Sequence, residues 1–183
     1  MLALMFIWTS CGDGRKDSTE VAEDQNEETM SNKTEDDAEF AVEAADGGMM
    51  EVELGTLALT KASSPDVKAF AQMMVDDHTK ANNELKALAQ QKNITLPTVM
   101  GNERQRKYDN LREKTGKDFD KDYIDLMVKD HKEDIDEFEE QGKDGNDADL
   151  KSWAASKVAT LQHHLQEAER IQEALKNNKN NNR

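Results

Sequence analysis

The chain has 183 residues, a formal net charge of −15, and only two prolines and one cysteine. This length suits one domain with short appendages. Ala, Glu, Asp, Lys, Gln and Met dominate, and aromatic residues make up only 5%, which favours helices over sheets. The acidic balance, with no basic stripe, argues against binding of nucleic acid. The single Cys11 excludes an internal disulfide.

The first eleven residues predict a membrane anchor. Residues 2–8 form an apolar run too short to span a bilayer, and Thr9 and Ser10 then precede Cys11. Small residues before a cysteine resemble the lipobox of bacterial lipoproteins, whose cysteine is acylated. We therefore expect a signal peptide over residues 1–11, a lipid anchor at Cys11, and a membrane-anchored lipoprotein of the bacterial cell envelope, in the periplasm or outer membrane. The alternative is a buried N-terminal segment with a free thiol.

An acidic stretch follows the cysteine. Residues 13–39 contain eleven acids and three basic residues, with almost no large apolar side chain. Such a composition is typical of a self-repelling, disordered tether. We therefore expect a disordered acidic linker over residues 12–37, and a second disordered segment at the Asn-rich tail, residues 178–183.

Helical periodicity begins near Ala38 and predicts one all-α domain over residues 38–177. Pro65 after two serines is typical of a helix start, and Asp147 is a candidate N-cap. Gly116 and the stretch 142–146 predict breaks. The expected helices cover residues 38–62, 65–92, 102–114, 119–141 and 147–176, so that the domain is a four-helix bundle with a short cross-helix between the second and third long helices.

Three of the four histidines share the apolar face of their helices. Residues 70–78 and 123–131 repeat an aromatic, Met, Val, Asp and His pattern at a constant offset, which ends at His78 and His131. Apolar residues lie three, four or seven positions from each of these histidines and from His164, so the three should point inward. His163 should face outward. Three inward imidazoles can share a metal, share carboxylates, or each hydrogen-bond a neighbour.

Carboxylates accompany these histidines. On the first long helix Glu53 is the preferred candidate, because Met49 and Leu57 flank it at −4 and +4. The predicted metal ligands are therefore His78, His131, His164 and Glu53. Further possible ligands are Glu51, Asp77, Asp130, Asp134 and Glu167.

The segments GGMMEVELGTLALTKASSPDVKAFAQMMVDDHTKANNELKALA, YIDLMVKDHKEDIDEFE and LQHHLQEA resemble a bacterial envelope family of ferritin-like type, domain of unknown function 4142. The likeness covers roughly residues 38–174. Membership implies an up-down four-helix bundle with a short cross-helix, usually secreted or membrane-anchored, and no established activity.

The sequence departs from the di-iron pattern of ferritin-like proteins, which places Glu three residues before His. Val75, Val128 and Leu161 occupy those positions here. We therefore expect a mononuclear site for zinc, copper or iron rather than a di-iron oxidase, with no organic cofactor and no catalytic residue. The domain is more simply a binding protein than an enzyme. The alternative is an interaction or scaffold bundle with structural histidines, and whether it pairs with another protein or itself stays open.

Overall fold

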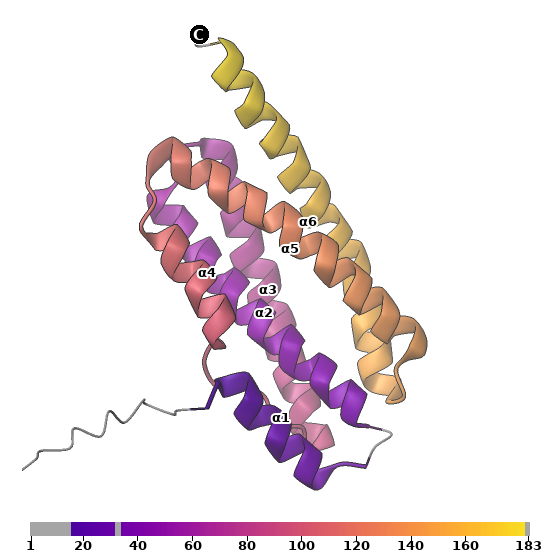
Figure 1. Cartoon of the computed structure of the whole chain (residues 1–183). Coiled ribbons are helices and arrows are strands. Elements are labelled where there is room, and N and C mark those ends of the chain that lie inside the picture. Colours follow the sequence, from indigo (N-terminus) through magenta and orange to yellow (C-terminus); the bar gives the residue numbers. More distant parts are fainter. Residues whose placement is uncertain (1–15, 32–33, 182–183) are drawn as a thin grey trace, which may run out of the picture.

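The computed structural model describes residues 16–31 and 34–181, which contain six α-helices and no β-strand (Figure 1). The all-α prediction is confirmed. The signal peptide and lipid anchor expected at residues 1–11 lie outside the described residues. The helices are α1 (Ser18–Thr29), α2 (Glu35–Lys61), α3 (Pro65–Lys92), α4 (Asn102–Arg112), α5 (Gly116–Asp144) and α6 (Ala148–Asn181).

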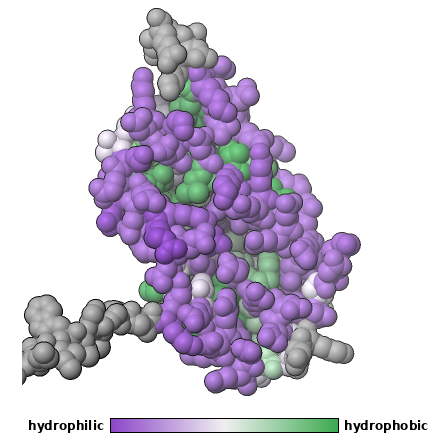
Figure 2. Space-filling view, viewed as in Figure 1, coloured by the Kyte–Doolittle hydropathy of each residue, from purple (hydrophilic) through white to green (hydrophobic). Residues whose placement is uncertain are grey.

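Short links fold the long helices into two antiparallel pairs. Residues 62–64 join α2 to α3, and residues 145–147 join α5 to α6. The two pairs pack against each other through α2 with α5 and α3 with α6, while α4 lies against α2 and α5 (Figure 1). Figure 2 shows a mostly hydrophilic surface with smaller areas of hydrophobic residues visible on it. None of the described helices is both long and apolar enough to cross a membrane.

The apolar core is divided into two clusters along the helices. The larger one contains Met50, Leu54, Met74 and Tyr123. The smaller one contains Ala38, Ala41, Leu85, Ala89, Ile94 and Leu150. On α3 and α6 a stretch of residues separates the two clusters and holds the buried His78 and His164. On α2 the buried Glu51 lies next to Met50, at the edge of the larger cluster. The fold therefore surrounds a polar centre with apolar packing on both sides.

Helix α1 lies inside the segment that the sequence predicted to be a disordered linker. Asp17 caps it by accepting from the Thr19 N–H, and its other oxygen accepts from the Asn102 N–H at the start of α4. Asn26 is buried and bonds both the N–H and the carbonyl of Thr95, at 2.7 and 2.9 Å. These polar contacts with distant backbone hold an acidic helix that has little apolar surface of its own, and the linker prediction is wrong here.

Other boundaries differ by a few residues. Helix α2 starts at Glu35, three residues before the expected start. Gly116, expected to break the chain before α5, is the first residue of α5 and has a φ of 59°, which favours glycine. The expected N-cap at Asp147 is confirmed, since its carboxylate accepts from Asp149 and Leu150 N–H groups at 3.0 Å. Helix α6 continues to Asn181, into the segment expected to be disordered.

The start of α3 is capped by a residue from another helix. Ser64 makes no side-chain capping bond, and the buried Asp120 of α5 instead accepts from the N–H groups of Ser63 and Ser64 at 2.9 Å and from the Ser63 hydroxyl. One carboxylate thus joins the turn between α2 and α3 to α5.

Replacing this carboxylate should weaken the fold. Asp120→Ala leaves two backbone N–H groups without their acceptor, and we expect the free energy of unfolding to fall by about 2–3 kcal/mol. Urea unfolding followed by circular dichroism measures the change. The control is Asp136→Ala, an exposed acid on the same helix, which should change the free energy by less than about 0.5 kcal/mol. Equal effects in the two variants would contradict the capping role.

Candidate metal centre

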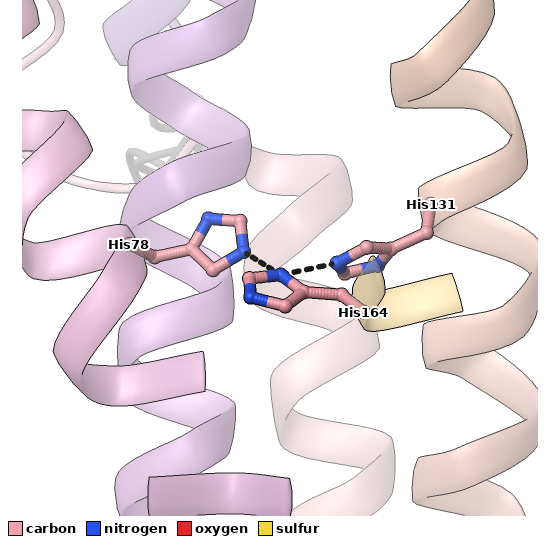
Figure 3. Close-up of side chains that lie close together, drawn as sticks. All are labelled: His78, His131 and His164. Atoms are coloured by element: carbon pink, nitrogen blue, oxygen red, sulfur yellow. Dashed lines mark hydrogen bonds between the residues drawn. The ribbon is translucent and has the colours of Figure 1, made fainter. Parts of the chain in front are cut away.

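Three histidines from three helices meet in the interior. His78 of α3, His131 of α5 and His164 of α6 are all buried. Nδ1 of His164 lies 3.3 Å from Nε2 of His78 and 3.3 Å from Nε2 of His131 (Figure 3). The structure thus brings together the three histidines that the apolar stripes placed inward, and His163 is exposed as expected.

Two of the three rings have an acceptor on their outer side. Nδ1 of His131 lies 3.1 Å from the carbonyl of Met127, and Nε2 of His164 lies 2.9 Å from a carboxylate oxygen of Asp77. A carbonyl can only accept, and an ionised carboxylate likewise, so both of these ring nitrogens carry the proton. The inner nitrogens, Nε2 of His131 and Nδ1 of His164, then each carry a lone pair, and the two lone pairs face each other.

Glu51 of α2 completes the surroundings of His78. Its Oε2 lies 2.6 Å from Nδ1 of His78, and its Oε1 lies 3.6 Å from Nδ1 of His131, too far for a hydrogen bond. Burial, followed by the nearby Asp130, raises the pKa of Glu51 well above its usual value. With no cation bound, the carboxyl therefore keeps a proton and donates it to His78, whose Nε2–H then donates to His164.

The imidazoles stay neutral at physiological pH. Burial lowers the pKa of His78 and of His164 to about 4, although Asp77 opposes this shift in both residues. Burial also lowers the pKa of His131 well below its ordinary value, and the neighbouring His78 and His164 add to the effect. Neutral imidazole is the form that binds a metal ion, so the inner nitrogens of His131 and His164 are available as they stand. Nε2 of His78 becomes available when it loses its proton and Nδ1 takes up the proton of Glu51.

Glu53, the carboxylate preferred from the sequence, lies on the exposed side of α2. Two residues correspond to about 200° around a helix, so Glu51 and Glu53 face opposite ways. The flanking Met49 and Leu57 are only partly buried, while Met50 and Leu54 form the fully buried stripe. The choice of Glu53 is wrong for this reason. The pattern also offered Glu51, because Leu54 and Ala58 lie three and seven residues after it, but the packing of α2 decides between the two glutamates.

The other predicted carboxylates are distributed around the centre. Asp77 bonds His164, and Asp134 lies close enough to Glu51 and His131 for the three to share an ion. Asp130 is buried and faces away, with one oxygen 3.5 Å from the Lys107 ammonium. Glu167 lies at the surface of α6 and pairs with Arg170 at 3.0 Å. The structure therefore brings Asp77 and Asp134 to the histidines and leaves Asp130 and Glu167 outside.

Arg104 of α4 was not singled out from the sequence. Its guanidinium lies 3.1 Å from Asp46, 3.3 Å from Glu43 and 3.9 Å from Asp130. It also lowers the pKa of Glu51, against the larger effect of burial. No periodicity in the short α4 marks this residue, because its role depends on which acids the other helices present to it.

Among the described residues, two groups bring ligand atoms close enough together to hold one metal ion. In each, one ligand atom per residue lies within 4.8 Å of the others: His78, His131 and His164 in the first group, and Glu51, His131 and Asp134 in the second. These observations define an all-helical protein with a buried cluster of three histidines that carboxylates orient.

A family model described as Domain of unknown function (DUF4142) matches residues 20–171, and the chain belongs to this family. The match begins within α1, so this helix is part of the family domain and not a linker before it. No curated protein and no solved structure matches the chain.

Proposed function

We propose that this domain binds one transition-metal ion through Nε2 of His78, Nε2 of His131 and Nδ1 of His164. Two nitrogens held about 2.05 Å from a tetrahedral zinc ion lie roughly 3.3 Å apart. The two separations around His164 are each 3.3 Å. This agreement between ligand spacing and coordination geometry is the observation that carries the proposal.

The outer hydrogen bonds support the same assignment. Metal-bound imidazoles usually donate their second N–H to a carboxylate or a carbonyl, which fixes the ring and its tautomer. Asp77, the Met127 carbonyl and Glu51 lie in these positions for the three rings. A cation at the inner nitrogens also removes the repulsion between the facing lone pairs of His131 and His164. Imidazole ligands suit zinc, copper and iron, and all three are candidates.

The proposal extends to the place of the protein in the cell. We infer an envelope lipoprotein anchored at Cys11, on the sequence pattern of residues 1–11. The long helices α2, α3, α5 and α6 each supply at least one side chain to the centre, which suits a ferritin-like four-helix bundle. Binding, storage or stress protection is favoured over oxidase chemistry, because Val75, Val128 and Leu161 replace the carboxylates of the di-iron pattern.

One observation favours a scaffold function with structural histidines. The hydrogen bonds from Glu51 through His78 and His164 to Asp77 satisfy two of the rings without any ion. Nε2 of His131 has no donor in that arrangement, since its only close partner among the described residues is the acceptor Nδ1 of His164. The missing donor at Nε2 of His131 therefore favours metal binding over this alternative.

Metal content distinguishes the two functions. The untagged full-length chain carrying Cys11→Ser, freed of metal and then incubated with zinc, copper or iron, should retain about one ion per chain of at least one of these metals. A variant with His78, His131 and His164 all replaced by alanine should retain less than about one tenth of that amount. Plasma mass spectrometry on desalted protein measures both. His163→Ala is the control and should bind as the parent does. Metal-free parent protein would leave the histidines structural.

A further inference from the structure

A pocket of about 100 Å³ reaches from the surface to the histidines. Residues of α2, α3, α5 and α6 line it, and His78, His164 and Glu51 belong to its walls. This volume accommodates a few water molecules or a hydrated ion, but no larger organic ligand. The pocket therefore lets water or a hydrated ion reach the histidines from the surface.

The charge of the pocket selects what enters it. Its lining includes five carboxylates and two lysines. One lysine, Lys157, forms an ion pair with Glu84, which is not part of the lining. The other four carboxylates still outnumber the lysines when Glu51 holds its proton, and a cleft with an excess of one sign of charge concentrates ions of the opposite sign and raises their association rate. The five carboxylates are Glu43, Glu51, Asp77, Asp134 and Glu137.

The inner end of the pocket holds a second set of possible ligands. Glu51, Asp134 and His131 each offer one ligand atom within 4.8 Å of the others. The Glu51 side chain is only 3% exposed, and among the described residues no donor bonds its Oε1. A buried carboxyl oxygen without a donor is costly, and a cation that displaces the proton of Glu51 would satisfy it. This set shares His131 with the three-histidine group, so the two positions are adjacent.

We propose that Asp134 and Glu51 form a capture position for a divalent transition-metal cation, from which the ion passes to His78, His131 and His164. The inference rests on the proposed metal-binding function and adds the path and the order of ligands. Carboxylates at the pocket replace part of the ion's hydration shell, and the imidazoles, which suit zinc, copper and iron better, then hold it. The bound metal ion can in this case exchange with ions in solution, and the pocket carboxylates set the rate at which the ion binds.

The rate of cobalt binding tests this proposal. Metal-free full-length Cys11→Ser protein is mixed with cobalt(II) in a stopped-flow instrument, and the visible absorption of the bound ion reports loading. Asp134→Asn should slow loading by about tenfold at low ionic strength while leaving the final amount of bound cobalt unchanged. Added salt should slow the parent more than this variant, because it screens the attraction. Asp136→Asn, the same charge change at an exposed position of α5, is the control.

The outcomes separate this proposal from the proposed function. Cobalt bound at the same rate by the parent and by Asp134→Asn would overturn the capture position and leave the three-histidine site intact. Loss of bound cobalt in Asp134→Asn would also overturn it, because Asp134 would then be a permanent ligand. A parent that binds no cobalt, zinc, copper or iron would refute both. If circular dichroism shows that Asp134→Asn is unfolded, Glu137→Gln at the same pocket replaces it and should slow loading by at least about threefold.

Discussion

Zinc should raise the thermal stability of the metal-free protein by roughly 10 °C. An ion that binds only the folded state adds about 4 kcal/mol when its free concentration is a thousand times the dissociation constant. For a chain of this size, each kcal/mol corresponds to about 2–4 °C in the melting temperature. Differential scanning calorimetry at a series of free zinc concentrations measures the shift, which should grow with the logarithm of the concentration.

Two variants assign this stabilisation to the histidine cluster. His131→Ala removes a side chain that is 0% exposed, so its own melting temperature will fall, and the informative quantity is the shift caused by zinc. That shift should drop below about 2 °C, because a three-ligand site reduced to two binds weakly. His163 lies next to His164 on the exposed side of α6, and the His163→Ala variant should keep the full zinc-induced shift. An equal response in both variants would place the zinc outside the cluster.

In a variant that lacks the carboxyl groups of Glu51 and Asp134, the metal-free protein should lose stability as the pH falls from about 6.5 to 4. The folded pKa values of His78 and His164 are about 4, below the ordinary 6.5, so the unfolded chain takes up these protons first. Their contribution is complete above pH 6.5 and is lost as the pH falls through this window. Each shift corresponds to roughly 3 kcal/mol.

Glu51 and Asp134 act in the opposite direction. Burial raises the pKa of each carboxyl well above its usual value, so the folded protein takes up these protons first and gains stability as the pH falls. Urea unfolding of Glu51→Gln/Asp134→Asn at pH 7, 6, 5 and 4 therefore isolates the histidines and should show a loss of several kcal/mol. The parent should lose less over the same range. A double variant with constant stability would refute burial of neutral histidines.

The local sequence was sufficient to predict most of the helices and the inward direction of the histidines. The apolar stripes at helical spacing predict α2, α3, α5 and α6 to within a few residues at most ends. The same spacing placed His78, His131 and His164 inward. Periodicity is a property of a single helix, and burial of one face follows from it. No tertiary information is needed to reach this point.

The carboxylates could not be assigned with the same certainty. Glu51 and Glu53 both have apolar neighbours on α2, and the choice between them depends on how far the helix is rotated toward α3 and α5. Packing sets this rotation: the fully buried Met50 and Leu54 define the inner face, which includes Glu51. An error of half a turn was enough to choose the exposed residue.

What the sequence by itself determined is thus the all-helical class, the order of the long helices, the family and the three inward histidines. The tertiary structure alone decided that the acidic segment before α2 forms a docked helix, that Asp120 caps the start of α3, that Arg104 pairs with acids of α2 and α5, and that Glu51 faces His78. The physical reason is common to these cases. Each depends on a polar contact between residues far apart in the chain, and such contacts leave no periodic pattern in either partner's local sequence.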